Sequence, residues 1–178
     1  VSSYRYFVGD GVKELVLRAL PKGDYSKESM DQFVNEIKKE YTDRWNKKTR
    51  PYPGIQDLLE ELRKRNIILG VLTNKPHEFA RSMMDYYFPK IHFQSIKGFR
   101  EGIPKKPDPA QIFYMLRELN AAPETALYLG DSDVDMMTAK RSGVYPVGAL
   151  WGFRDQSELI QTWREGCCPS PHRSSCRH

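Results

Sequence analysis

The second part of the chain alternates short apolar segments with amphipathic ones, and this alternation constrains the fold more than any other feature. After residue 50 the pattern predicts strands over 67–74, 93–98, 125–131 and 144–151, with helices over 55–66, 76–88, 108–120 and 134–143. Strands that alternate with helices predict an α/β fold with a parallel sheet. In such sheets ligands bind just beyond the carboxyl ends of the strands.

The first fifty residues have a different pattern, which predicts a separate helical unit. Apolar residues recur at helical spacing over 9–20 and 30–45, and the stiff RPYPG stretch at 50–54 predicts a hinge. We therefore expect a small helical domain over 1–50, an α/β core over 51–160 and an irregular tail over 161–178.

Composition makes several classes of function less favoured. The net charge of +5 comes from Lys and Arg scattered among acidic residues, which favours a solvated surface over a nucleic-acid interface and also suits a small anionic substrate. No apolar run is long enough to span a membrane, and no membrane partner is expected. The three cysteines all lie within the last twelve residues, so a core without cysteine agrees with a cytoplasmic location. The sequence does not indicate an oligomeric state.

Polar residues follow three of the predicted strands, and together they have the chemistry of a phosphate and metal site. They are Thr73 with Asn74, Lys105 with Lys106, and Asp131 with Asp133 and Asp135. Donors that face carboxylates can hold a phosphate beside a hard cation such as Mg²⁺. A lysine would neutralise charge on a transferring phosphoryl group, and the Thr73 hydroxyl would bind its oxygens.

Each of these residues also has a simpler interpretation. Asp131 or Asp133 would serve as the N-cap of a helix that begins near Val134, and Asp133 fits that role better than a metal role. Lys105 and Lys106 would be surface charges, and the residues after the first strand an ordinary turn. Three such groups on successive strand ends favour one shared site over three coincidences.

The stretches VLTNKP (71–76), KKPDP (105–109) and GDSDVD (130–135) resemble, in order and spacing, the second, third and fourth motifs of the haloacid dehalogenase superfamily of phosphohydrolases. The closer resemblance, over Phe7 to Ser157, is to the phosphoglycolate phosphatase group. It implies a Rossmann-like core with an α-helical cap. It also implies Mg²⁺-dependent hydrolysis of a small phosphate monoester, most readily 2-phosphoglycolate, through an aspartyl-phosphate.

The resemblance assigns roles on the substrate side of the site. Thr73 would be the phosphate-binding hydroxyl and Asn74 a neighbouring contact. Lys106 would be the motif lysine, with Lys105 as the alternative. Asp10 and Gly11 match a cap segment that would lie near the substrate and help to select the leaving group.

The fourth motif supplies the carboxylates. By resemblance, Asp131 would ligate Mg²⁺ directly, and Asp135 would act through a water or by orienting the lysine. Asp133 falls at a variable position of the motif.

The first motif of the superfamily, an Asp-x-Asp-Gly-Thr run that supplies the nucleophile and the acid/base carboxylate, does not occur in the sequence. Asp10 and Gly11 imitate its second half, but Val8 stands where the nucleophile would be. The first core strand is thus expected to be missing between the strands that end at Thr73 and Asp131. We hypothesise a truncated version of a longer protein whose preceding residues carry the nucleophile.

Other functions remain open. One is a non-catalytic relative, or an inactive fragment, that binds phosphate and metal without turnover. A weaker one is a nucleic-acid-binding module. The Cys and His residues after residue 166 have no standard zinc spacing, which favours an irregular tail over a metal cluster.

Overall fold

The computed structural model describes residue 7 and residues 11–165. The first helices are α1 (Val12–Ala19), α2 (Lys27–Lys48) and α3 (Ile55–Lys64). The strands and remaining helices are β1 (Gly70–Pro76), α4 (His77–Tyr87), β2 (Ser95–Phe99), α5 (Ala110–Glu118), the short 3₁₀ helix η2 (Pro123–Thr125), β3 (Leu127–Gly130), α6 (Asp133–Ser142), β4 (Tyr145–Gly148) and α7 (Gln156–Glu165).

The strands form two parallel pairs, which confirms the predicted parallel α/β fold. β1 pairs with β2 and β3 pairs with β4, in registers that set Gly70 opposite Ser95 and Leu127 opposite Tyr145. The two pairs are not hydrogen-bonded to each other, and no strand among the described residues lies between β1 and β3. Each of these two strands therefore has a hydrogen-bonded neighbour on one side only.

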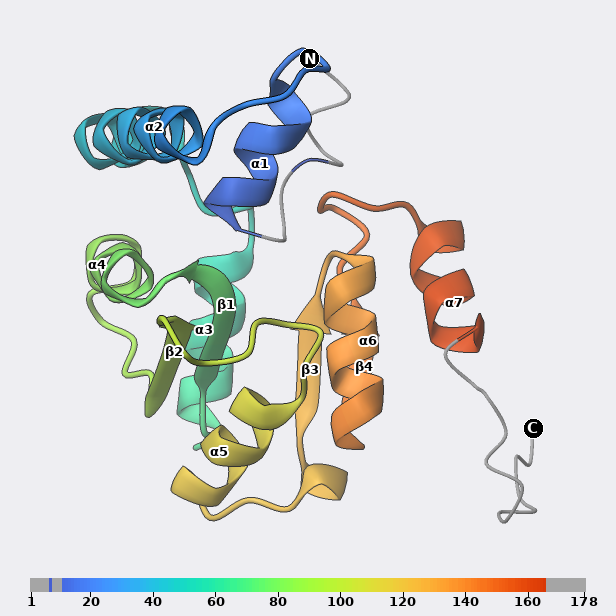
Figure 1. Cartoon of the computed structure of the whole chain (residues 1–178). Coiled ribbons are helices and arrows are strands. Elements are labelled where there is room, and N and C mark those ends of the chain that lie inside the picture. Colours follow the sequence, from blue (N-terminus) through green and yellow to red (C-terminus); the bar gives the residue numbers. More distant parts are fainter. Residues whose placement is uncertain (1–6, 8–10, 166–178) are drawn as a thin grey trace.

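The main apolar cluster lies between α5 and the strands. Ile112 and Leu116 on α5 are buried together with Val144, and Leu72 of β1 and Tyr128 of β3 pack against them. This cluster ties both strand pairs to one helix, so it fixes the relative positions of the two strand ends. α6 covers β3 and β4 (Figure 1).

The two N-terminal helices form a layer beyond the carboxyl ends of the strands (Figure 1). Aromatic contacts dock α2 on α4: the ring centroids of Tyr41 and Phe79 lie 5.3 Å apart, and Trp45 packs edge-on against Tyr86 and Tyr87. Such pairs typically contribute about 0.5–1.5 kcal/mol beyond the area they bury. The helical layer is thereby held over the end of the core where ligands are expected.

The last predicted strand is shorter than expected. The sequence predicts a strand over 144–151, whereas β4 ends at Gly148 and the chain then turns. The Gly152 N–H donates to the Ala149 carbonyl, and the Arg154 N–H donates to the Asp131 carbonyl, at 3.2 Å each. These bonds satisfy the backbone in a turn rather than in a strand ladder. The turn brings residues 152–154 against the fourth motif.

The tail expected from residue 161 is a second difference, because α7 continues to Glu165. Leu159 is buried, and the Lys140 ammonium of α6 donates to the Trp163 carbonyl over 2.7 Å. Packing on α6 thus extends the helix past the predicted boundary. The cysteines, and with them the zinc hypothesis, lie outside the described residues. None of the helices in the described part is long and apolar enough to cross a bilayer.

Candidate active site

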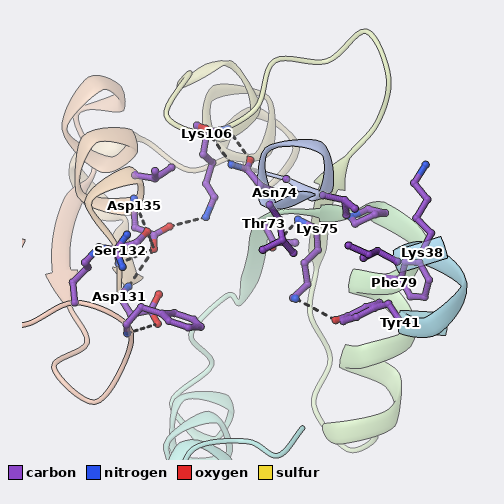
Figure 2. A pocket seen from close by; sticks show the side chains of 18 residues that line it. Lys38, Tyr41, Thr73, Asn74, Lys75, Phe79, Lys106, Asp131, Ser132 and Asp135 are labelled. Carbon is purple, nitrogen blue, oxygen red and sulfur yellow. Dashed lines mark hydrogen bonds and ion pairs between the residues drawn. The ribbon is translucent and has the colours of Figure 1, made fainter. Parts of the chain in front are cut away.

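A cavity of about 360 Å³ opens between the carboxyl ends of β1 and β3 and the helical layer (Figure 2). The core residues that line it include Thr73, Asn74, Lys106, Asp131, Ser132 and Asp135. From the helical layer, Gly11, Lys38 and Tyr41 also line it. Residues of all three resembling motifs therefore meet around one space. Asp10 lies outside the described residues, so its predicted substrate contact is not located.

Lys106 and Asp135 form an ion pair at the centre of the site. The Lys106 ammonium lies 2.6 Å from Asp135 Oδ1 and 3.1 Å from the Tyr128 hydroxyl, and both charged side chains are about nine-tenths buried. Lys105 does not take this position, because its ammonium packs on the Phe99 ring at 4.5 Å. Of the two candidate lysines, the structure brings Lys106 to the motif carboxylate.

Asp135 is surrounded by donors. Its Oδ2 accepts from the Ser132 hydroxyl at 2.6 Å and from the backbone N–H groups of Asp131 and Ser132 at 3.2 Å each. Its Oδ1 accepts from Lys106 and Tyr128. Both carboxylate oxygens are therefore fully engaged within the protein.

Ser132 is the N-cap of α6, so the prediction that Asp131 or Asp133 caps this helix is wrong. The Ser132 hydroxyl accepts from the Asp135 N–H, and the Asp135 carboxylate accepts from the Ser132 N–H, which makes a reciprocal capping box. The helix begins at Asp133, one residue earlier than predicted. Asp133 instead forms an ion pair with Arg154 at 3.5 Å.

The surroundings of Lys106 and Asp135 shift the pKa values of both side chains. Burial alone would raise the pKa of Asp135, but the facing Lys106 and the donors around it lower the pKa below its usual value. Burial would lower the pKa of Lys106, but Tyr128 and Asp135 raise it well above its usual value. Burial raises the pKa of Tyr128 to about 12. The ion pair is thus fully charged at neutral pH.

Asn74 holds the lysine loop against the end of β1. Its side-chain amide donates to the Lys106 carbonyl at 3.1 Å, and its oxygen accepts from the Lys106 N–H at 2.9 Å. This two-way contact positions the Lys106 backbone. A direct contact between Asn74 and a substrate stays a prediction.

Asp131 differs from Asp135 in its environment. It is half-buried, and its Oδ2 accepts from the Phe153 N–H at 3.2 Å; backbone N–H groups, those of Phe153 and of Asp131 itself, are the donors that lower its pKa. Burial and the nearby charge of Asp135 raise its pKa, and the Phe153 N–H only partly opposes this shift. Its ionised form thus lacks the compensation that Asp135 has.

Two glycines let the backbone approach these carboxylates closely. A Cβ atom on Gly130 would lie 2.2 Å from the Cβ of Asp135, and one on Gly152 would lie 2.2 Å from the Cβ of Asp131. No side chain fits at such distances. Gly152 belongs to the turn after β4, and it is this packing that places the Phe153 N–H against Asp131.

Thr73, in the middle of β1, lines the cavity and has a hydroxyl that can donate into it. Its oxygen accepts from the Lys75 N–H at 3.1 Å, which leaves the hydroxyl proton for a ligand. The Lys75 ammonium lies 3.2 Å from the hydroxyl of Tyr41 on α2 (Figure 2).

Three further residues of the site have only weak signals in the sequence. Lys75 was visible only as one of several polar residues past a strand, and Tyr128 only as a tyrosine in an aliphatic strand. Tyr41 belonged to the helical pattern of the N-terminal layer. Nothing in that pattern distinguishes a cavity-lining tyrosine from a packing one.

The described part of the chain contains no group of three or more His, Cys, Asp or Glu side chains placed to hold a metal ion.

Comparison with known proteins identifies the family to which the chain belongs. The family model described as haloacid dehalogenase-like hydrolase matches residues 3–149. The chain belongs to this family, which confirms the resemblance drawn from the three motifs.

A phosphoglycolate phosphatase of Pseudomonas putida is 31% identical over 156 residues. The match covers 86% of this chain, which spans 57% of the length of that relative.

Solved structures share the fold. A protein from Lactobacillus delbrueckii subsp. bulgaricus, described as a candidate phosphoglycolate phosphatase, superposes with a TM-score of 0.82 at 28% identity over 90% of this chain and 75% of its own. CbbY from Rhodobacter sphaeroides in complex with phosphate superposes with a TM-score of 0.69 at 25% identity, over 82% of this chain and 68% of its own.

Proposed function

We propose that this chain provides the phosphate-binding and metal-binding part of a haloacid dehalogenase-type phosphatase acting on a small phosphate monoester, 2-phosphoglycolate first among them. One observation carries the proposal. The Thr73 hydroxyl, the Lys106–Asp135 ion pair and the incompletely compensated Asp131 carboxylate all line one cavity at the strand ends. The Pseudomonas putida relative is named as a phosphoglycolate phosphatase, and this name supports the proposed reaction class.

The donor set fits a hard divalent cation. The Asp131 carboxylate has backbone donors but no cationic side chain bound to it among the described residues, and its raised pKa reflects an ionised form that a cation would stabilise. Mg²⁺ bound there together with a substrate phosphate would supply charge neutralisation to the phosphoryl group. Asp135 has both oxygens engaged, so we assign it to holding Lys106 rather than to the metal.

The remaining roles follow from the same contacts. The Thr73 hydroxyl donates to a phosphate oxygen, and the Lys106 ammonium, held by Asp135 and Tyr128, faces the negative charge of the phosphoryl group. Asn74 keeps the lysine loop in place. Lys75 and Tyr41 lie at the helical side of the cavity, where they would contact the leaving group. A cytoplasmic location agrees with these roles and stays a prediction.

The aspartyl-phosphate step requires a nucleophile, and the sequence contains no Asp-x-Asp-Gly-Thr run. The proposed reaction forms a bond between phosphorus and a carboxylate oxygen, releases the alcohol of the monoester, and then transfers the phosphoryl group to water. We therefore expect binding without turnover for the 178-residue chain. We expect turnover once a strand that carries this motif precedes it.

The test compares Mg²⁺-dependent phosphate release from 2-phosphoglycolate by the 178-residue chain and by a version lengthened with that motif strand. Turnover by the lengthened version alone supports the proposal. If neither version turns over while phosphate and Mg²⁺ still bind, the chain is a non-catalytic binding relative. If neither ligand binds, the assignment of the cavity is wrong.

A matched pair of variants tests the carboxylate roles in the active version. Asp131→Asn should reduce turnover more than Asp133→Asn, because only Asp131 lines the cavity. Equal losses would contradict the metal assignment.

A further inference from the structure

A second cavity, of about 350 Å³, lies beside β2. Its lining includes His77, Lys97, Gly98, Arg100, Ala110 and Gln111. None of these residues lines the first cavity, and the proposed phosphatase reaction uses none of them. The lining combines several basic side chains with no acidic one.

The N-terminal ends of two helices meet at this cavity. His77 is the first residue of the 11-residue helix α4, and Ala110 is the first of the 9-residue helix α5. The Ala110 N–H donates to Asp108, but the next N–H, that of Gln111, has no acceptor among the described residues. Unpaired N–H groups and the positive ends of two helix dipoles favour an anion.

The His77 ring adds a directed donor. The Gly98 N–H donates to His77 Nδ1 over 3.3 Å, so this nitrogen is unprotonated and the proton of the neutral ring is on Nε2. The side chain is nine-tenths buried, and within the described part of the chain its Nε2 has no hydrogen-bond partner. Because His77 lines the cavity, its Nε2–H is available to a ligand there.

The charges around the ring are mostly positive. Burial is the main reason why the pKa of His77 is lowered, and Arg100 is the next, with Arg81 and Lys97 adding to it against the opposing Glu78. Lys97 is balanced by Glu118 at 2.6 Å. Arg100 forms no ion pair with a carboxylate of the described residues, so its guanidinium supplies net positive charge at the cavity.

We propose that this cavity is a second binding site, for the phosphate group of a small phosphorylated molecule. The donors belong to separate elements, namely the Arg100 guanidinium after β2, the His77 ring of α4 and the start of α5, which suits an anion with several oxygens. The Ile103 side chain lines the same cavity and offers an apolar surface to an organic remainder. The proposal does not depend on the phosphatase function.

Amide proton–nitrogen NMR spectra of the 178-residue chain, titrated with inorganic phosphate, test the proposal residue by residue. We expect the Gly98 and Gln111 resonances to shift if the second cavity binds the anion. Shifts at Asn74 and Ser132 would report the first cavity separately. A titration with phenylphosphonate, which cannot be hydrolysed, identifies the source: tighter binding than inorganic phosphate indicates an organic phosphate, and equal binding indicates the free ion.

Arg100→Gln should weaken binding at the Gly98 and Gln111 resonances by about tenfold, because a hydrogen bond to a charged group is lost. Arg100 is exposed, so the variant should fold normally. Arg81→Gln on the exposed face of α4 is the matched control and should change binding by less than about twofold. Absence of shifts at Gly98 and Gln111, or equal effects of the two variants, would overturn the proposal whatever happens at the first cavity.

Discussion

The two ends of the Asp131–Asp135 segment face the same cavity, but the protein treats them in opposite ways. At the Asp135 end, a buried carboxylate meets a lysine, a tyrosine, a serine and two backbone donors. At the Asp131 end, a half-buried carboxylate has backbone donors alone among the described residues, Phe153 foremost, and no charged partner bound to it.

This difference separates a structural from a ligand-binding role. A carboxylate whose hydrogen-bonding capacity is filled by the protein stabilises the fold and orients its partners, but it has nothing left for a ligand. A carboxylate that is desolvated without full compensation costs stability until a cation or proton arrives. The pKa values shift accordingly, downward for Asp135 and upward for Asp131.

The largest expected effect comes from breaking the Asp135 end. Lys106→Met leaves the buried Asp135 carboxylate without its counter-ion, which should lower the free energy of unfolding by about 3–5 kcal/mol. Urea denaturation measures the change. Lys105→Met is the matched control and should cost about 1 kcal/mol or less, because it removes one cation–π contact with Phe99. Similar losses in both variants would show that the ion pair is not the stabilising element.

A smaller loss of stability is expected when the Ser132 N-cap beside Asp135 is removed. Ser132→Ala removes the hydroxyl that accepts from the Asp135 N–H and donates to its carboxylate, and should cost about 1–2 kcal/mol. Ser132→Thr keeps the hydroxyl and should restore most of the loss in the same denaturation experiment. Failure of threonine to restore stability would point to packing rather than to the capping box.

The Asp131 end should respond with the opposite sign. Asp131→Asn keeps the shape and an acceptor for the Phe153 N–H but removes a charge that repels Asp135. Without metal, we expect the free energy of unfolding to rise by roughly 0.5–1 kcal/mol, a value already reduced for the screening of a half-exposed group. Mg²⁺ should then no longer stabilise the protein.

The pH dependence of the free energy of unfolding tests whether charge causes the gain expected for Asp131→Asn. The folded-state pKa of Asp131 lies above its ordinary value of 3.8, so the folded chain binds this proton more tightly than the unfolded chain. The stability that the proton contributes is present below pH 3.8 and is lost as the pH rises through the raised pKa. The gain from Asp131→Asn should therefore appear above that pKa and vanish in acid. A gain that persists unchanged in acid would exclude charge as its origin.

The sequence predicts the fold and the members of this site better than it predicts their division of labour. Alternating periodicity predicts the parallel strands, and polar residues after the strands predict a site with Thr73, Lys105 or Lys106, and the aspartates of 131–135. The family resemblance then selects Lys106 and Asp131. The sequence does not show which of the carboxylates has its negative charge compensated by neighbouring groups. Tyr128, the Phe153 backbone and the turn after β4 reach the site only through tertiary packing.

The prediction of the N-cap residue of α6 failed for a local reason. Asp131, Ser132 and Asp133 are all good N-cap residues, and a shift of one position decides which of them caps the helix. The reciprocal pair of Ser132 with Asp135 decides it, since a capping box satisfies two backbone donors at once. A lone aspartate cap satisfies one.

The smallest effect should come from Asp133, the carboxylate that belongs to neither end. Its side chain is 42% exposed and pairs with Arg154 at 3.5 Å, a distance and exposure at which an ion pair contributes about 0.5 kcal/mol or less. Asp133→Asn should therefore leave the denaturation midpoint and Mg²⁺ binding nearly unchanged. Because Arg154 also lines the cavity, a loss of phosphate affinity in Asp133→Asn with unchanged stability would show that Asp133 positions this arginine. Asp133 would then contribute to ligand binding, as Asp131 does, rather than to stability.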